Sequence, residues 1–219
     1  MKQKYHTLAD LPTTLPLFPL SGALLLPRTD LPLNIFEPRY VEMLETAMEG
    51  NRLVGLIQPE PQQGQDIPKL MRTGCAGRIT SYSETVDGRL IITLTGVCRF
   101  VLMSEAEVNT PYRQGVVDYT PYEIDLVSGA GVASVDRAQV LDAFRQFLDS
   151  NNMTTNWDDV NSVNTEVLVN TLSLLAPYTP RDKQALLEAP DLKTRSEVLI
   201  ALTELALKKS LGGNSTRMQ

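Results

Sequence analysis

Few residues of the chain combine the types and the spacing that enzymatic chemistry requires. The sequence contains a single histidine, His6, which lies in the polar N-terminal stretch 1–13. A serine or cysteine nucleophile is activated by a base held rigidly beside it, most often a histidine. A histidine in a loosely held tail does not meet that requirement, so the sequence predicts no Ser–His or Cys–His catalytic group.

The two cysteines, Cys75 and Cys98, form neither a metal-binding pattern nor a disulfide framework. Zinc ligands commonly occur in C-x-x-C or H-E-x-x-H patterns, and neither pattern is present. Because both cysteines lie in strand-like stretches, we interpret them as buried thiols of a reducing compartment. A single bridge between them stays open at this point, and no bound metal is expected.

The glycine-rich stretch 129–134 matches a dinucleotide-binding loop only in part. Its third glycine is missing and no βαβ pattern surrounds it. The phosphate-binding motif G-x-x-x-x-G-K-[ST] does not occur in the sequence. We therefore interpret this stretch as a linker and expect no cofactor.

Carboxylates are numerous, but their spacing favours a solvated surface. Glu42, Glu45 and Glu49 fall on one polar helix face, and Asp158 and Asp159 are adjacent. A glycosidase would need two carboxylates at a fixed separation across a cleft, which a sequence does not reveal. A hydrolase that works without histidine is therefore the least favoured function, and we predict no catalytic residue.

Binding chemistry is the remaining possibility, and Glu37, Arg39 and Tyr40 are its candidates. They lie at a strand-to-helix corner, where the planar fork of Arg39 can bind a carboxylate or a carbonyl. The structural alternatives are that Tyr40 belongs to the core and that Glu37 caps the helix.

Three other residues stand out. Trp157 is the only tryptophan, and the sequence leaves open whether it packs between helices or anchors an interface. We expect Phe100 inside the sheet and Arg99 at its rim.

The stretch 15–50 contains the elements that position the corner. Its short apolar runs are interrupted by prolines, which suits edge strands or strand starts. Pro38 is suited to the first turn of a helix that presents Tyr40, Met43, Leu44, Ala47 and Met48 on one stripe. Gly50 is expected to end that helix in the left-handed conformation.

The next part of the chain predicts short strands. A buried strand is expected at 53–57, an exposed loop at 59–68, and further strands at 100–108 and 114–119. Asp87-Gly88 favours a type I′ turn between strands at 78–86 and 89–95. Gly96 is expected at a bulge or corner. Together these features predict a strongly bent sheet or pseudo-barrel.

After the small residues of 127–135, the apolar residues recur at helical spacing. We expect four amphipathic helices in a bundle. Thr179 with Pro180 and Asp182 is suited to one helix start, and Thr194 with Glu197 to a capping box for the last helix. Gly212 and Gly213 are expected to end that helix.

Several stretches together resemble the N-terminal domain of Lon proteases, a module that also occurs as a stand-alone bacterial protein and in cereblon. The matching stretches are LPLFPL (15–20), NIFEPRY (34–40), 74–79, 87–89, 96–100, 111–112, and KQALLE (183–188) with Arg195. The ATPase and Ser–Lys protease modules of a full Lon protease have no counterpart in the sequence.

The resemblance implies an α+β fold: a PUA-like, strongly bent sheet with one helix at 14–126, a linker at 127–135 and a helical bundle at 136–212. It implies a non-catalytic module that binds unfolded or degron-bearing polypeptides, with a protease or chaperone as a further candidate partner. It places Glu37, Arg39 and Tyr40 in a region implicated in polypeptide recognition.

Composition constrains the alternatives. A net charge of −6 argues against binding to phosphate backbones or anionic membranes, so nucleic acid is an unfavoured partner. An RNA-associated accessory protein is the alternative that the PUA-like resemblance leaves open. The sequence shows no secretory signal and no membrane-spanning run, which predicts a cytoplasmic protein. It does not predict an oligomeric state.

Overall fold

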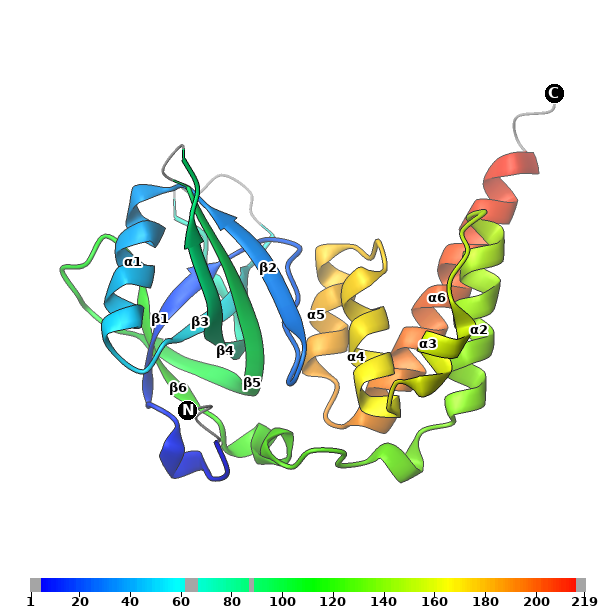
Figure 1. Ribbon diagram of the computed structural model, residues 1–219, viewed down its shortest axis with the longest axis horizontal. Coiled ribbons are helices and arrows are strands. Elements are labelled where there is room, and N and C mark those ends of the chain that lie inside the picture. The colour runs from blue at the N-terminus through cyan, green and yellow to red at the C-terminus, as the bar shows by residue number, and fades with distance from the viewer. Residues whose placement is uncertain (1–4, 62–66, 87–88, 216–219) are drawn as a thin grey trace. The chain divides into compact units, whose positions relative to one another are not determined.

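The computed structural model describes residues 5–61, 67–86 and 89–215, with the side chains of the last helix described as far as Lys208. The chain divides into two compact units, Met1–Ser128 and Gly129–Gln219. The first unit is built mainly from strands and the second from helices, which confirms the predicted α+β fold (Figure 1). We call them the sheet unit and the helical unit and describe each by itself.

The sheet unit contains one six-stranded mixed sheet in the order β2-β5-β4-β3-β1-β6. β6 pairs with both β1 and β5, so the sheet curls back on itself into the expected pseudo-barrel. Among the described residues of this unit, α1 is the one α-helix (Figure 1), and η1 and η2 are short 3-10 helices. The strands and helices are β1 (Thr14–Pro19), β2 (Asp30–Ile35), α1 (Pro38–Glu49), β3 (Leu53–Pro59), β4 (Leu70–Glu84), β5 (Leu90–Glu105), β6 (Gln114–Asp118), η1 (Leu8–Asp10) and η2 (Thr120–Leu126).

The sheet bends where small residues let the backbone come close. Gly77 pairs with Gly96, whereas the preceding pair is Ala76 with Cys98, so Val97 is an extra residue in β5. This register shift confirms the predicted bulge at Gly96. A Cβ atom on Gly96 would lie 2.0 Å from the backbone oxygen of Leu26, so only glycine fits.

α1 presents the predicted stripe, with Tyr40, Met43, Leu44 and Ala47 buried. Its end differs from the prediction, because Gly50 has a φ of −103° and is not left-handed. The left-handed residue is Arg52, with a φ of 64°, and its N–H donates to the Ala47 carbonyl at 2.9 Å. The reversal that closes the helix therefore lies two residues later than expected.

Two strands of the structure have other bounds than predicted. Two further predicted features fall on residues outside the described ranges. β4 is longer than the strand expected at 78–86, and β5 is one continuous strand where separate strands were expected at 89–95 and 100–108. The predicted turn at Asp87-Gly88 and positions 62–66 of the expected loop lie outside the described residues. Cys75 and Cys98 are both buried and free, so the possible bridge does not form.

The helical unit contains five α-helices among the described residues, where four were predicted. The extra helix, α3, is separate because Asn156 accepts the N–H of Asp158, and Asn164 then caps α4 by accepting the N–H of Val167. The elements are η3 (Val132–Ser134), α2 (Arg137–Ser150), α3 (Trp157–Ser162), α4 (Thr165–Leu175), α5 (Pro180–Glu188) and α6 (Leu192–Ser215).

Two predicted ends of α6 are wrong. Asp191 accepts the N–H of Thr194 at 2.7 Å, so the helix begins at Leu192 and Thr194 lies inside it. At its other end the helix continues through Gly212 and Gly213 to Ser215.

A buried arginine connects three helices of this unit. The Nε atom of Arg195 in α6 donates to the Leu186 carbonyl of α5 at 3.1 Å, and Nη1 donates to Asn170 of α4 at 2.9 Å. Buried guanidinium groups need such partners. Arg195, which carries part of the family resemblance, therefore has a structural role.

The predicted cap of α5 at Thr179 is present, and together with Asp182 it forms a full capping box. The Thr179 hydroxyl accepts the N–H of Asp182 at 3.3 Å and donates to its carboxylate at 2.6 Å. We expect Thr179→Ala to lower the free energy of unfolding by about 1 kcal/mol, because the first turn of α5 loses its cap. Thr46→Ala is the matched control, because Thr46 is exposed inside α1 and its hydroxyl donates to the Glu42 carbonyl without capping a helix. Urea denaturation of both variants measures the difference. An equal loss in the two variants would contradict the capping role.

Within the described residues, no helix has the length and apolar character needed to cross a membrane.

Candidate functional site

The strand-to-helix corner brings Glu37, Arg39 and Tyr40 together. Nε and Nη2 of Arg39 both donate to one carboxylate oxygen of Glu37, at 2.9 and 2.7 Å. The Arg39 guanidinium also lies 4.5 Å from the centre of the Tyr40 ring. The fork of Arg39 is therefore already engaged, and a ligand would have to displace Glu37 or bind to the pair. Its role in binding stays a prediction.

Of the two structural alternatives at this corner, a core position for Tyr40 is confirmed and a capping role for Glu37 is wrong. Tyr40 is a core residue, because its buried ring packs 4.6 Å from the ring of Phe18. That burial raises the pKa of its hydroxyl. Glu37 occupies the N-cap position of α1, but its side chain accepts no hydrogen bond from the helix, so the capping interpretation is wrong.

Sequence reasoning missed an exposed aromatic residue beside the corner. Phe36 follows β2 and is 67% exposed, whereas Ile35 before it is buried. The alternation of a strand puts successive side chains on opposite faces, so buried Ile35 was the signal for an outward Phe36. The corner therefore has an exposed apolar ring at the residue before Glu37.

Arg99 is not at the sheet rim as expected, because its side chain is 1% exposed. The Asp125 carboxylate of η2 accepts hydrogen bonds from Nε and Nη2 of Arg99, each at 2.8 Å, and from its backbone N–H at 3.0 Å. Tyr122 covers the guanidinium at 4.2 Å. This group ties β5 to η2 and is structural. Phe100 is buried, as predicted.

The environment of Cys98 does not suit a nucleophile. Burial raises the pKa of its thiol strongly, and the nearby charge of Asp125 adds to the increase. The reactive thiolate is therefore disfavoured in the folded protein.

We expect both thiols to react with Ellman's reagent about 100-fold more slowly in the folded protein than in guanidinium chloride, because reaction requires local opening. The absorbance of the released thiol measures both rates. A Cys98→Ser variant identifies the contribution of Cys75. Equal rates in the folded and unfolded protein would contradict the assigned burial.

No metal-binding cluster is present among the described residues, since no three or more His, Cys, Asp and Glu side chains come together suitably. His6 is exposed, and its backbone N–H donates to Asp10 at 2.9 Å. It contributes to a wide groove of the sheet unit that also contains Arg28, Arg78 and Asp30.

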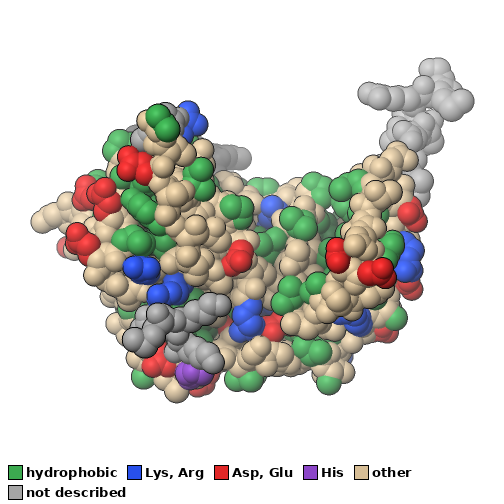
Figure 2. Space-filling model, viewed as in Figure 1, with side chains coloured by type: hydrophobic (Ala, Val, Ile, Leu, Met, Phe, Trp, Pro, Cys, Tyr) green, Lys and Arg blue, Asp and Glu red, His purple; other side chains and the backbone are tan. Residues whose placement is uncertain are grey.

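The arginines of this groove already have partners within the protein. Arg28 donates to the Asp125 carbonyl at 2.5 Å, and Arg78 donates to the Tyr5 hydroxyl at 3.0 Å. On the face shown in Figure 2, Lys and Arg side chains are scattered among Asp and Glu and do not gather into a patch. This arrangement does not resemble a phosphate-backbone surface.

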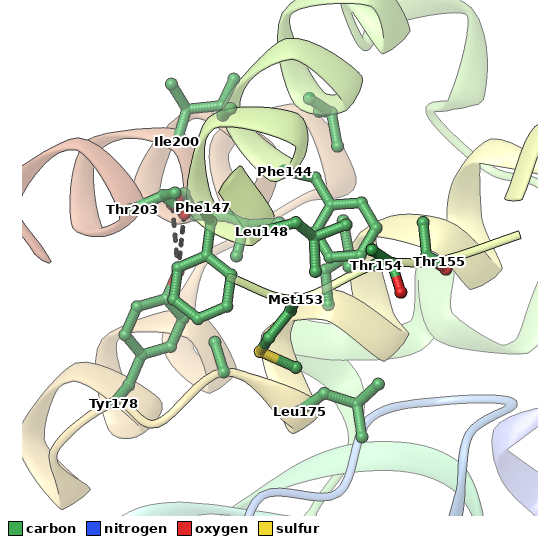
Figure 3. Close-up of a pocket in the computed structure, with 15 residues that line it drawn as sticks. Phe144, Phe147, Leu148, Met153, Thr154, Thr155, Leu175, Tyr178, Ile200 and Thr203 are labelled. Atoms are coloured by element: carbon green, nitrogen blue, oxygen red, sulfur yellow. Dashed lines mark hydrogen bonds between the residues drawn. The ribbon is translucent and has the colours of Figure 1, made fainter. Parts of the chain in front are cut away.

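The helical unit contains an apolar pocket with a volume of about 250 Å³. Figure 3 shows side chains from α2, α4 and α6 and from the segment before α3 converging around it. Every lining side chain is uncharged, and three of them are aromatic. They are Val140, Ala143, Phe144, Phe147, Leu148, Met153, Thr154, Thr155, Leu172, Leu175, Ala176, Tyr178, Leu199, Ile200 and Thr203.

The pocket combines a polar contact in its wall with exposed apolar side chains. The hydroxyls of Tyr178 and Thr203 are 2.7 Å apart, and Thr203 also donates to the Leu199 carbonyl at 2.8 Å. Leu175 is 76% exposed and Met153 is 53% exposed. Large apolar side chains exposed around a concave apolar surface are typical of binding sites.

Trp157 packs against Phe144, which lines the pocket, and is not itself a lining residue. Its ring lies 6.0 Å from that of Phe144, edge to face, and the Arg145 guanidinium lies 4.6 Å from it. The packing alternative for Trp157 is therefore the one that the structure supports.

The pocket could not be found from the sequence. Its helical residues belong to regular apolar stripes, and such stripes predict a filled core. Only the placement of α2, α4 and α6 reveals that the space between the stripes is incompletely filled.

A family model describes most of the chain: the ATP-dependent protease La (LON) substrate-binding domain matches residues 14–204. A Lon protease of Roseiflexus castenholzii is 25% identical over 199 residues, which are 89% of this chain and 24% of that protein. A Lon protease of Desulfosudis oleivorans is 31% identical over 96 residues, 42% of this chain and 12% of that protein. The chain thus spans about a quarter or less of the length of these relatives.

Solved structures show the same fold. The Lon N-terminal domain protein from Xanthomonas campestris has a TM-score of 0.62 at 22% identity, covering 87% of this chain and 98% of that one. The N-terminal domain of Lon protease from Mycobacterium avium complex has a TM-score of 0.61 at 17% identity, with the same coverage of both chains.

Proposed function

Since the chain belongs to the LON substrate-binding domain family, we propose that it binds unfolded or degron-bearing polypeptides and catalyses no reaction on them. Proteases and chaperones that act on the same polypeptides are its expected partners. A cytoplasmic location, which the sequence predicts, is part of the proposal.

The observation that carries the proposal is the apolar pocket with Leu175 and Met153 exposed around it. Unfolded polypeptides differ from folded ones in exposing large apolar side chains, and an open apolar pocket distinguishes the two by burying such a side chain. The exposed ring of Phe36, the residue before Glu37, offers a second contact of the same kind in the sheet unit.

The absence of catalysis is supported by the chemistry of the described residues. The buried thiol of Cys98 is held in its neutral form, and His6 is exposed. The Tyr178 and Thr203 hydroxyls in the pocket wall hydrogen-bond within the protein and are not paired with a base. Neither hydroxyl therefore has a neighbouring base that would activate it as a nucleophile.

The test compares the binding of this chain to the unfolded and to the native form of one labelled test protein. A labelled protein kept unfolded by carboxymethylation of its cysteines is titrated with this chain, and fluorescence anisotropy is followed. We expect saturable binding at tens of micromolar and none to the native form of the same protein. A labelled structured RNA is titrated in the same way, to test the alternative of an RNA-associated protein. Binding of RNA that weakens steeply with salt, without binding of the unfolded protein, would overturn the proposal.

A further inference from the structure

We propose that the pocket of the helical unit binds one large uncharged side chain, aromatic by preference, from an extended polypeptide segment that runs along Met153–Thr155. This inference rests on the proposed function and names the part of the polypeptide that the helical unit recognises.

The volume of the pocket limits which group can occupy it. An apolar cavity of roughly 150 Å³ is enough to hold benzene. A volume of about 250 Å³ therefore holds one aromatic side chain with space for part of a neighbour. A helix, with a diameter of about 10–12 Å including its side chains, is too wide to enter. The pocket is thus suited to a single side chain projecting from an extended backbone.

The chemistry of the lining selects an uncharged side chain. None of the lining residues carries a charge, and the Tyr178 and Thr203 hydroxyls already hydrogen-bond within the protein. A carboxylate or ammonium group would lose its hydration here without finding a partner. Phe144 and Phe147 instead offer ring surfaces, against which another aromatic ring packs favourably.

The segment beside the pocket can hold the backbone of the polypeptide. Met153, Thr154 and Thr155 connect α2 to α3 without helical structure. The Met153 N–H donates to the Leu148 carbonyl at 2.9 Å. Across the described parts of the chain, neither the backbone nor the hydroxyl groups of Thr154 and Thr155 hydrogen-bond to another residue. An extended peptide can use these groups as it would the edge of a strand.

The exposed side chains around the pocket favour the same occupant. Leu175 lies at the C-terminal end of α4, and Met153 begins the extended segment. Both are more than half exposed in the free protein, so a chain laid beside the pocket would remove their apolar surface from water. Met153 is also flexible enough to adapt to side chains of different shape.

The experiment observes the pocket directly. The full chain is labelled with ¹³C at its methionine methyl groups, and the Met153 resonance is assigned with a Met153→Leu variant. The probe is an end-blocked Gly-Ser peptide with one central phenylalanine. We expect a saturable shift of the Met153 resonance. Peptides with alanine or aspartate in place of phenylalanine should bind about tenfold to hundredfold more weakly.

Two exposed leucines give a matched pair of variants. Leu175→Asp places a charge at the pocket and should weaken the phenylalanine peptide about tenfold or more. Leu205→Asp makes the same change at an exposed position of α6 that does not line the pocket, and should leave the affinity unchanged. Circular dichroism establishes that both variants fold.

The outcomes separate this inference from the proposed function. If the carboxymethylated protein binds equally well to wild type and to Leu175→Asp, and the Met153 resonance does not move, the pocket inference is overturned while polypeptide binding stands. If neither the peptide nor the carboxymethylated protein binds, both are overturned. Equal binding of the phenylalanine and aspartate peptides would contradict the selectivity alone.

Discussion

Replacing Asp125 with alanine is expected to lower the free energy of unfolding of the sheet unit by about 3–5 kcal/mol, because it leaves a buried arginine without its charge partner. Asp125 accepts three hydrogen bonds from Arg99, two from the guanidinium and one from the backbone N–H. The aromatic ring of Tyr122 does not replace a carboxylate. Urea denaturation followed by circular dichroism measures the loss.

An exposed ion pair provides the control. Nε and Nη2 of Arg113 also donate to the two carboxylate oxygens of Glu105, but both side chains are partly exposed. Glu105→Ala should therefore cost about 1 kcal/mol or less. Replacing both buried partners, as Arg99→Met with Asp125→Leu, should restore much of the stability lost in Asp125→Ala. Equal losses for Asp125→Ala and Glu105→Ala would show that burial does not govern this pair.

Gly96→Ala is expected to destabilise the sheet unit by about 3 kcal/mol or more, because the new methyl group would overlap backbone atoms. The Cβ atom would lie 2.0 Å from the Leu26 oxygen and 2.7 Å from its carbonyl carbon. These atoms belong to the main chain and cannot move aside as a flexible side chain would. Strand β5 or the chain before β2 must shift, which disturbs the bulge.

Gly50→Ala is the matched control for this variant. A Cβ atom on Gly50 would meet only the Thr46 and Ala47 oxygens, at 3.7 and 3.8 Å, which are ordinary contacts. Because the ψ of Gly50 is −132°, which suits alanine less well than glycine, we expect a small fall in the urea midpoint of Gly50→Ala and a much larger fall for Gly96→Ala. If Gly96→Ala unfolds at the wild-type midpoint, the close approach of β5 to Leu26 is wrong.

The sequence predicted the elements whose signals are local. Pro38 and the apolar stripe of α1 were enough for that helix, and Thr179 with Asp182 was enough for the start of α5. These features depend on residues within a few positions of each other, where backbone geometry dictates the contacts. The family resemblance supplied the arrangement of the sheet, which local patterns alone do not determine.

The failures concern residues whose partners are distant in the chain. Arg99 was placed at the rim because a charged side chain is expected outside, and Asp125, which makes its burial possible, lies in a different element. Glu37 stands at the N-cap position of α1 with an oxygen that could accept, but its carboxylate pairs with Arg39 instead. The pocket of the helical unit depends on how the apolar stripes of α2, α4 and α6 pack together, and the pattern of one stripe alone does not predict this packing.

The most direct test of the central claim measures binding and integrity together. The carboxymethylated protein is incubated with this chain, the complex is isolated by size-exclusion chromatography, and the intact mass of the bound polypeptide is determined. We expect a complex in which the polypeptide keeps its full mass after prolonged incubation. A polypeptide that is shortened by the purified chain, or that never co-elutes with it, would contradict a protein that holds its substrate without cutting it.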